Sequence, residues 1–134
     1  MTPAISPTEK NSKHLVQVYN ISMTTISSII LPIYQKYTPK FAKIGGKVDL
    51  AIKDPSLSVK NPKMTEVTII NVLSVILKDT KKPHLIISGT DKYLIIKEEN
   101  TLLMPDFKAK ITELEDVKAS SRIGFGTKIQ FPLL

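Results

Sequence analysis

The sequence predicts a domain of the α+β class that is mainly β, with one N-terminal helix packed on an antiparallel sheet or small sandwich or barrel of seven or eight strands. Three observations lead to this fold class. Isoleucine and valine are abundant and tryptophan is absent, and β-branched residues suit the pleated surface of a sheet. Apolar and polar residues alternate in several short segments. One longer segment near the N-terminus has a helical period instead.

The chain is long enough for one domain with its own core. Its 134 residues match a common domain size, and the sequence has neither repeats nor low-complexity tracts. We therefore expect a single domain over residues 1–134. Within it we expect an N-terminal arm (1–12), a helical part (13–44) and a β part (45–134).

The expected helix covers residues 13–37, where apolar side chains recur at spacings of three and four. Pro32 would kink this helix because proline lacks the N–H that a helix interior needs. Pro39 disfavours helical backbone in the residue before it, so we expect the helix to end near Tyr37. One short helical turn should then follow and stop at Gly45, since glycine is the usual residue just past a helix.

Strands are expected from residue 47 to the C-terminus, where the apolar period becomes two. Residues 65–78 are ambiguous because their polar residues follow a helical period while their β-branched content favours a strand; we prefer the strand. A hairpin loop at Gly89-Thr90-Asp91 opens a three-stranded meander. The expected strands lie over residues 47–53, 56–60, 65–78, 84–104 (three strands), 107–120 (running into a loop or a short helix) and 123–131.

The absence of cysteine excludes several kinds of site. Without thiols there can be no disulfide, no thiolate zinc site, no iron–sulfur cluster and no cysteine nucleophile. The first residues make a poor signal peptide, and the longest unbroken apolar run, residues 29–34, is far shorter than a bilayer span. We expect an intracellular protein (cytoplasm or nucleus), or one inside a virion or infected cell.

The positive charge of the chain is unevenly distributed. The net charge is +7, and nearly all of the basic residues are lysines, with Arg122 the single arginine. Residues 1–97 carry the excess, while residues 98–134 are slightly acidic. Lysines interleaved with aromatic residues suit single-stranded nucleic acid, since the charges follow phosphates and the rings stack on bases.

We therefore predict a non-enzymatic protein that binds nucleic acid without sequence specificity. The alternative for the first cluster is that its aromatic residues face the core while its lysines face solvent. The candidate nucleic-acid-binding residues are Lys36, Tyr37, Lys40, Phe41, Lys43, Lys47, Lys78, Lys81, Lys82 and His84.

Catalytic motifs are missing from the sequence. The segment IGGK (44–47) lacks both the first glycine and the hydroxyl residue of a phosphate-binding loop. The segment GFG (124–126) lacks the third glycine of a dinucleotide fingerprint. His84 could act as a general base or phosphate donor, although a surface residue at the start of a strand is the simpler interpretation. We expect no catalytic residues.

A metal ion or another cofactor is not expected either. Glu113, Glu115 and Asp116 supply the oxygen ligands that divalent cations prefer. A solvated acidic loop is the simpler interpretation of these three carboxylates.

Assembly is the second functional hypothesis. The meander over residues 84–104 is apolar on both faces, and the chain ends in the apolar segment FPLL. Such surfaces suggest a homo-oligomer, or a subunit of a larger particle such as a viral or phage structural component, with no direct role for nucleic acid.

Overall fold

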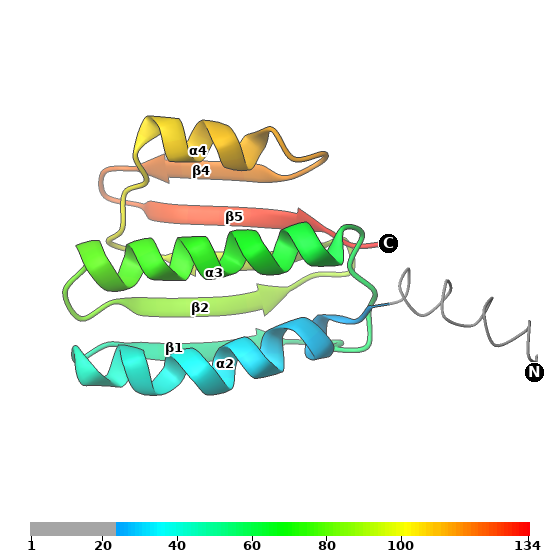
Figure 1. Cartoon of the computed structure of the whole chain (residues 1–134), viewed down its shortest axis with the longest axis horizontal. Coiled ribbons are helices and arrows are strands. Elements are labelled where there is room, and N and C mark those ends of the chain that lie inside the picture. The colour runs from blue at the N-terminus through cyan, green and yellow to red at the C-terminus, as the bar shows by residue number, and fades with distance from the viewer. Residues whose placement is uncertain (1–23) are drawn as a thin grey trace, which may run out of the picture.

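The protein consists of two layers, with helices on one face of a five-stranded mixed sheet (Figure 1). The computed structural model describes residues 24–134. The elements of this part are α2 (Ile26–Lys43), β1 (Lys47–Ile52), α3 (Pro62–Asp79), β2 (His84–Gly89), β3 (Tyr93–Glu98), α4 (Pro105–Thr112), β4 (Lys118–Arg122) and β5 (Gly126–Pro132).

The sheet has the strand order β1-β2-β3-β5-β4. Strands β1 and β2 are parallel because α3 crosses between them, whereas the other neighbours are antiparallel. Strand β5 lies between β3 and β4, so the C-terminal strand is inside the sheet and β4 is at its edge.

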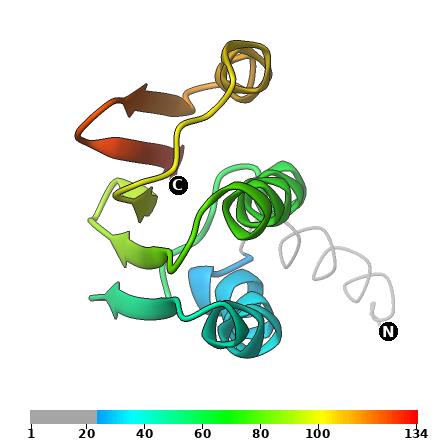
Figure 2. The same ribbon diagram turned by 90° about the vertical axis from the view of Figure 1, so that its left-hand side faces the viewer.

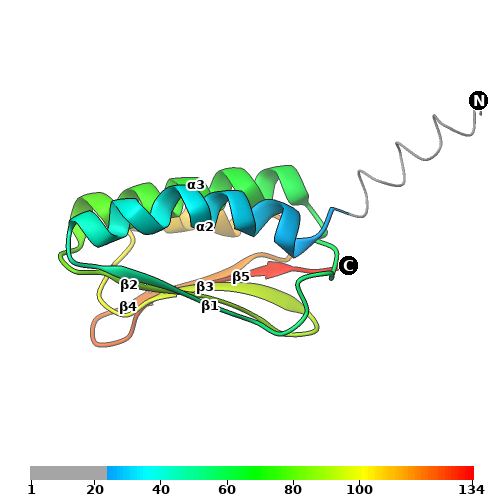
Figure 3. The same cartoon turned by 90° about the horizontal axis from the view of Figure 1, so that it is seen from below.

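All three described helices cover the same face of the sheet, and the opposite face carries no helix (Figures 2 and 3). Alternate residues of the central strands therefore point into the core between the two layers. Each large side chain buried there contributes about 1.5–3 kcal/mol to folding. The largest fully buried side chains are those of Phe41, Phe131, Ile26, Ile30, Ile69, Leu73, Ile76, Leu85, Ile87, Leu94 and Ile96.

Residues 65–78, expected to be a strand, lie in helix α3. The helical period of the polar residues was the correct signal, because the buried residues of α3 also recur at helical spacing. Packing of that apolar face on the sheet outweighs the weak β preference of isoleucine and valine. Pro62 stands in the first turn, where proline needs no N–H.

Helix α2 passes through Pro39 and ends at Lys43, so the expectation that it ends near Tyr37 is wrong. Both prolines of α2 lie on its exposed side, where water can solvate the carbonyl oxygens that lose a partner. The hydroxyl of Thr38 donates to the carbonyl oxygen of Tyr34 at 2.6 Å. The expected part of this helix before residue 24 lies outside the described residues.

The expected seven or eight strands and the sandwich or barrel are also wrong. The segment after β3, expected to be a third meander strand, is a loop that leads into α4. Residues 56–60 form isolated bridges rather than a strand. The segment 107–120 divides between α4 and β4. The expected strand at 47–53, the hairpin at Gly89 and the closing strand are present as β1, β2–β3 and β5.

Within residues 24–134, no helix is long and apolar enough to cross a membrane. The expected arm over residues 1–12 lies outside the described part of the chain. The division of the chain into arm, helical part and β part stays a prediction.

Two glycines of the β4–β5 hairpin provide a test of the packing. Both have positive φ, but a Cβ at Gly126 would lie 2.1 Å from the carbonyl oxygen of Glu98, whereas a Cβ at Gly124 meets nothing within 4 Å. We expect Gly126→Ala to lower the free energy of unfolding by about 3–4 kcal/mol and Gly124→Ala by about 1 kcal/mol. Urea denaturation measures both. Equal losses would contradict the close approach of β5 to the end of β3.

Candidate functional site

Glu98 is a buried carboxylate at the end of β3. It points toward the helix layer and is 1 % exposed. Its Oε1 accepts hydrogen bonds from the backbone N–H groups of Asn100 (2.7 Å) and Thr101 (2.6 Å) and from the Thr101 hydroxyl (2.8 Å). Its Oε2 accepts the backbone N–H of His84 at 2.9 Å. Oε1 takes three of these donors and Oε2 takes one, so the protein itself supplies donors to both oxygens, and the Glu98 carboxylate is called saturated in this sense below.

Threonine and serine hydroxyls extend this network across the sheet. The hydroxyls of Thr101 and Thr80 are 2.6 Å apart, and the Thr127 hydroxyl donates to the carbonyl oxygen of Thr101 at 2.6 Å. The Ser121 hydroxyl lies 2.9 Å from that of Thr127 and accepts the backbone N–H of Leu103 at 2.8 Å. The network thereby holds the loop between β3 and α4 to α3, β4 and β5.

A pocket of about 240 Å³ opens on the helix side, between the start of α3 and the segment after α4. Two carboxylates line it and no cationic side chain does. Beside it, the ammonium group of Lys60 is 2.7 Å from Asp116, and this hydrogen bond raises the pKa of Lys60. The lining residues are Asn61, Met64, Thr65, Glu113, Leu114, Glu115 and Val117.

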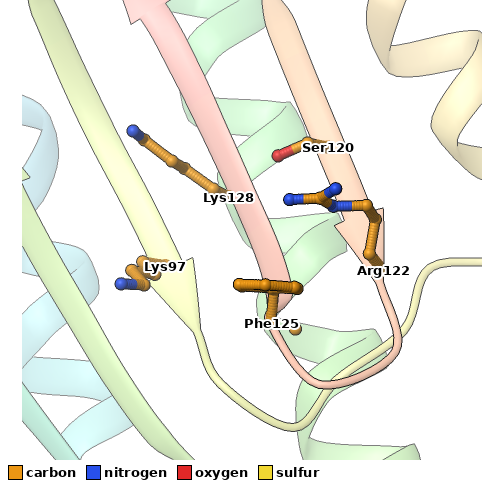
Figure 4. A pocket seen from close by; sticks show the side chains of 6 residues that line it. Lys97, Ser120, Arg122, Phe125 and Lys128 are labelled. Atoms are coloured by element: carbon orange, nitrogen blue, oxygen red, sulfur yellow. The ribbon is translucent and has the colours of Figure 1, made fainter.

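A second pocket, of about 180 Å³, lies on the open face of the sheet near the β4–β5 hairpin (Figure 4). Three of its side chains are cationic. Lys97 and Lys128 are direct partners across β3 and β5, and Arg122 lies 4.5 Å from the centre of the Phe125 ring. The lining residues, called the basic pocket below, are Lys97, Ser120, Arg122, Phe125, Gly126 and Lys128.

The cations of the basic pocket lack carboxylate partners. In the described part of the chain, the salt bridges involve the basic side chains of Lys60, Lys63 and His84 only. The strand register places one row across the open face as Asp49–Ile86–Lys97–Lys128–Ser120. Its single carboxylate is at the far edge of the sheet, 2.5 Å from the imidazole of His84.

The residues expected to bind nucleic acid are arranged differently from the expectation. Phe41 is fully buried and Tyr37 is 6 % exposed, so neither ring offers a free face for stacking on bases. Lys36 and Lys40 are exposed and place their ammonium groups 5.8 and 5.6 Å from the Tyr37 ring centre. The alternative, with aromatic rings in the core and lysines toward solvent, describes this cluster.

The two basic clusters of the sequence come together at one end of the molecule. The backbone N–H of Lys47 donates to the carbonyl oxygen of Pro83 at 2.9 Å, which joins β1 to the turn before β2. Gly45 lies against the side chain of Lys82 in the same region. Lys43, Lys78 and Lys81 are exposed, and Lys47 and His84 face each other across β1 and β2.

Sequence reasoning missed the basic pocket entirely. Its members come from three strands whose neighbours are known only from the sheet order. Two signals were available: Arg122 is the only arginine of the chain, and it is close to the exposed Phe125 in sequence. Glu98 gave no signal, because a glutamate beside a turn is normally solvated.

The acidic segment that could have held a cation is divided between two environments. Glu113 and Glu115 line the helix-side pocket, while Asp116 is engaged by Lys60. Among residues 24–134, no group of three or more histidine, cysteine, aspartate or glutamate side chains could hold a metal ion.

Comparison by sequence finds no matching family model and no matching curated protein. Comparison by structure finds histidine kinases. The catalytic domain of histidine kinase ThkA, in a nucleotide-free form, matches with a TM-score of 0.62 and 14 % identity over 81 % of this chain and 92 % of that domain. The cytoplasmic segment of histidine kinase QseC matches with a TM-score of 0.62 and 10 % identity over 82 % of this chain and 71 % of that segment.

The fold is that of histidine kinase catalytic domains. A third match is ThkA in complex with the response regulator protein TrrA, with a TM-score of 0.59 and 12 % identity. It covers 93 % of this chain but 47 % of the ThkA chain, so this chain spans about half the length of that kinase.

These neighbours correct the functional expectations from sequence. A non-enzymatic nucleic-acid-binding protein, a nucleic-acid partner and a homo-oligomer or viral or phage assembly subunit were expected, but the structural neighbours are histidine kinases, which are enzymes. The error arose because catalytic motifs were sought as short sequence patterns, whereas in this chain the likeness appears only when structures are compared.

A nucleotide does not fit the two pockets described above. The helix-side pocket is smaller than the roughly 300–1,000 Å³ that a ligand of this size needs, and its carboxylates would repel phosphate groups. The basic pocket has suitable charges but is smaller still. Among residues 24–134, Glu98 is the one buried carboxylate, and the protein's own donors already bond both of its oxygens.

The Glu98 network predicts a large loss of stability in a nearly isosteric variant. Glu98→Gln replaces one acceptor oxygen with an NH₂ group. Both carboxylate oxygens accept from backbone N–H groups, so the NH₂ group faces a donor and at least one N–H group loses its acceptor. We expect it to lower the free energy of unfolding by about 2–4 kcal/mol. The neighbouring Glu99 is exposed, so Glu99→Gln should change the free energy by less than about 0.5 kcal/mol. Similar small effects in thermal and urea denaturation would refute the network's structural role.

Proposed function

We propose that this chain is a kinase-type domain of a histidine kinase signalling system and that it works by binding a protein partner of that system. The match to the ThkA catalytic domain, which covers most of both chains, carries this proposal. An intracellular location, expected from the sequence, agrees with the resemblance to a segment of QseC described as cytoplasmic.

A protein partner is supported by one of the structural neighbours and by the surface of this chain. ThkA is known in complex with a response regulator. In this chain the sheet face without helices combines half-buried apolar and aromatic side chains, Ile86, Tyr93 and Ile95, with a basic margin. A partly apolar centre with a polar rim is the usual composition of a transient protein interface.

The direct test is a binding survey with defined partners. Response regulators from the organism that encodes this chain would be purified and titrated against the full chain by biolayer interferometry. We expect saturable binding to one or a few of them, with dissociation constants on the order of 1–100 µM as in transient signalling complexes. In parallel samples, transfer of phosphoryl groups from Mg-ATP to the same regulators would be followed on phosphate-affinity gels.

The outcomes separate clearly. Selective binding to a regulator supports the proposal, with or without phosphoryl transfer. The proposal fails if no regulator binds at about 1 mM, ten times the upper end of the expected range, and no regulator receives a phosphoryl group. Lys110→Glu, on the exposed side of α4, serves as a control for non-specific charge effects and should leave binding unchanged.

A further inference from the structure

The basic pocket contains a built-in electrostatic repulsion. Lys97 and Lys128 stand directly opposite each other on neighbouring antiparallel strands, and like charges in such pairs destabilise a sheet. Arg122 is two residues along β4 from Ser120, the partner of Lys128, so a third cation is diagonal to the pair. Figure 4 shows the three side chains on the same face of neighbouring strands, with the ends of Lys97 and Lys128 directed away from Arg122. A bound anion would relieve this repulsion.

The chain supplies no such anion within its described residues. Glu98, at the end of β3, points to the other side of the sheet and is bonded there. Glu99 is exposed and its backbone lies next to Gly126, but no salt bridge joins its carboxylate to a cation of the pocket. Asp49 is on the same face but on the opposite edge strand, where it contacts His84. The charge of the basic pocket is therefore available to a ligand from outside.

Large apolar side chains lie beside these charges. At the tip of the β4–β5 hairpin, Ile123 is 86 % exposed and Phe125 is 65 % exposed. The guanidinium of Arg122 lies over the Phe125 ring, which fixes both side chains next to the pocket. Exposed aromatic and arginine side chains are the commonest energetic centres of protein interfaces.

We propose that the basic pocket and the hairpin tip bind an acidic segment of a protein partner that carries at least one large apolar side chain. Carboxylates of the segment lie among Lys97, Arg122 and Lys128, and its apolar side chain packs on Ile123 and Phe125. The pocket volume of about 180 Å³ suits carboxylate side chains better than a larger ligand. This inference rests on the proposed function in that it takes the partner to be a protein.

The chemistry of the surface favours a protein segment over a nucleic acid. Non-specific binding of single strands uses several aromatic platforms along a groove. Here Phe125 is the one aromatic ring that lines the pocket. Tyr93, on the same face, is half-buried with the Lys118 ammonium 5.5 Å from its ring centre, and Tyr37 and Phe41 are buried. The isoleucine at the hairpin tip offers an apolar contact that a phosphate would not use.

The test uses the full chain and a fluorescein-labelled peptide of about twelve residues in which Glu and Asp alternate with Phe and Leu, a length that spans the face of one sheet. Fluorescence anisotropy should show micromolar binding that weakens about 3–10-fold between about 50 and 200 mM salt. Arg122→Gln and Lys128→Gln should each weaken binding about 5-fold or more, and Phe125→Ser about 3-fold. Lys110→Gln, on the helix side, is the matched control and should have no effect.

All four substituted residues are exposed, and circular dichroism would check that each variant is folded. The inference is overturned if Lys110→Gln weakens binding as much as Lys128→Gln does, or if the peptide does not bind at about 50 mM salt. It is also overturned if an unlabelled single-stranded oligonucleotide of equal charge displaces the peptide and binds more tightly, since the surface would then select nucleic acid.

The same variants separate this inference from the proposed function. If a response regulator binds the chain and Arg122→Gln leaves that binding unchanged, the basic pocket is not the binding surface, while the proposed function stands. If no regulator binds but the peptide does so through Arg122 and Phe125, the surface is correct and the proposed function fails.

Discussion

The saturated carboxylate of Glu98 is the constraint on which the arrangement of the protein depends. It takes a negative charge out of water at the end of β3, which is costly unless donors within the protein replace the lost water at both oxygens. Those donors come from the start of β2 and from the loop after β3. Through Thr101 the same group fixes the positions of α3, β4 and β5.

Because these polar groups are hydrogen-bonded within the protein, the two faces of the sheet differ in chemistry. On the helix side, the polar groups between the layers bond to one another, and the pocket between the start of α3 and the segment after α4 has two carboxylates and no cation in its lining. On the open side, the cations of the basic pocket have no carboxylate partners among the described residues. The fold resembles that of kinase catalytic domains, and in this chain the cationic pocket is on the side of the sheet opposite the helices.

Local patterns in the sequence predicted those parts of the fold that local physics determines. Strict alternation identified β1 and β5, and the loop at Gly89 identified the β2–β3 hairpin. Helix α3 was misjudged because β-branched residues fit a helix once the sheet buries them, which only tertiary structure decides. The roles of Glu98 and of the basic pocket could not be predicted from the sequence for a related reason. The partners of Glu98 and the neighbours of Lys97 depend on strand order, which no spacing in the sequence encodes.

The central claim is that the open face of the sheet, and not the helix side, is the binding surface. Chemical-shift mapping on ¹⁵N-labelled protein with the acidic peptide tests this claim most directly, because each backbone amide reports its own position. The account predicts the largest shifts over residues 95–98 and 118–130, with residues 61–76 and 113–117 unchanged. Shifts concentrated at residues 61–65 and 113–117, around the helix-side pocket, would contradict it.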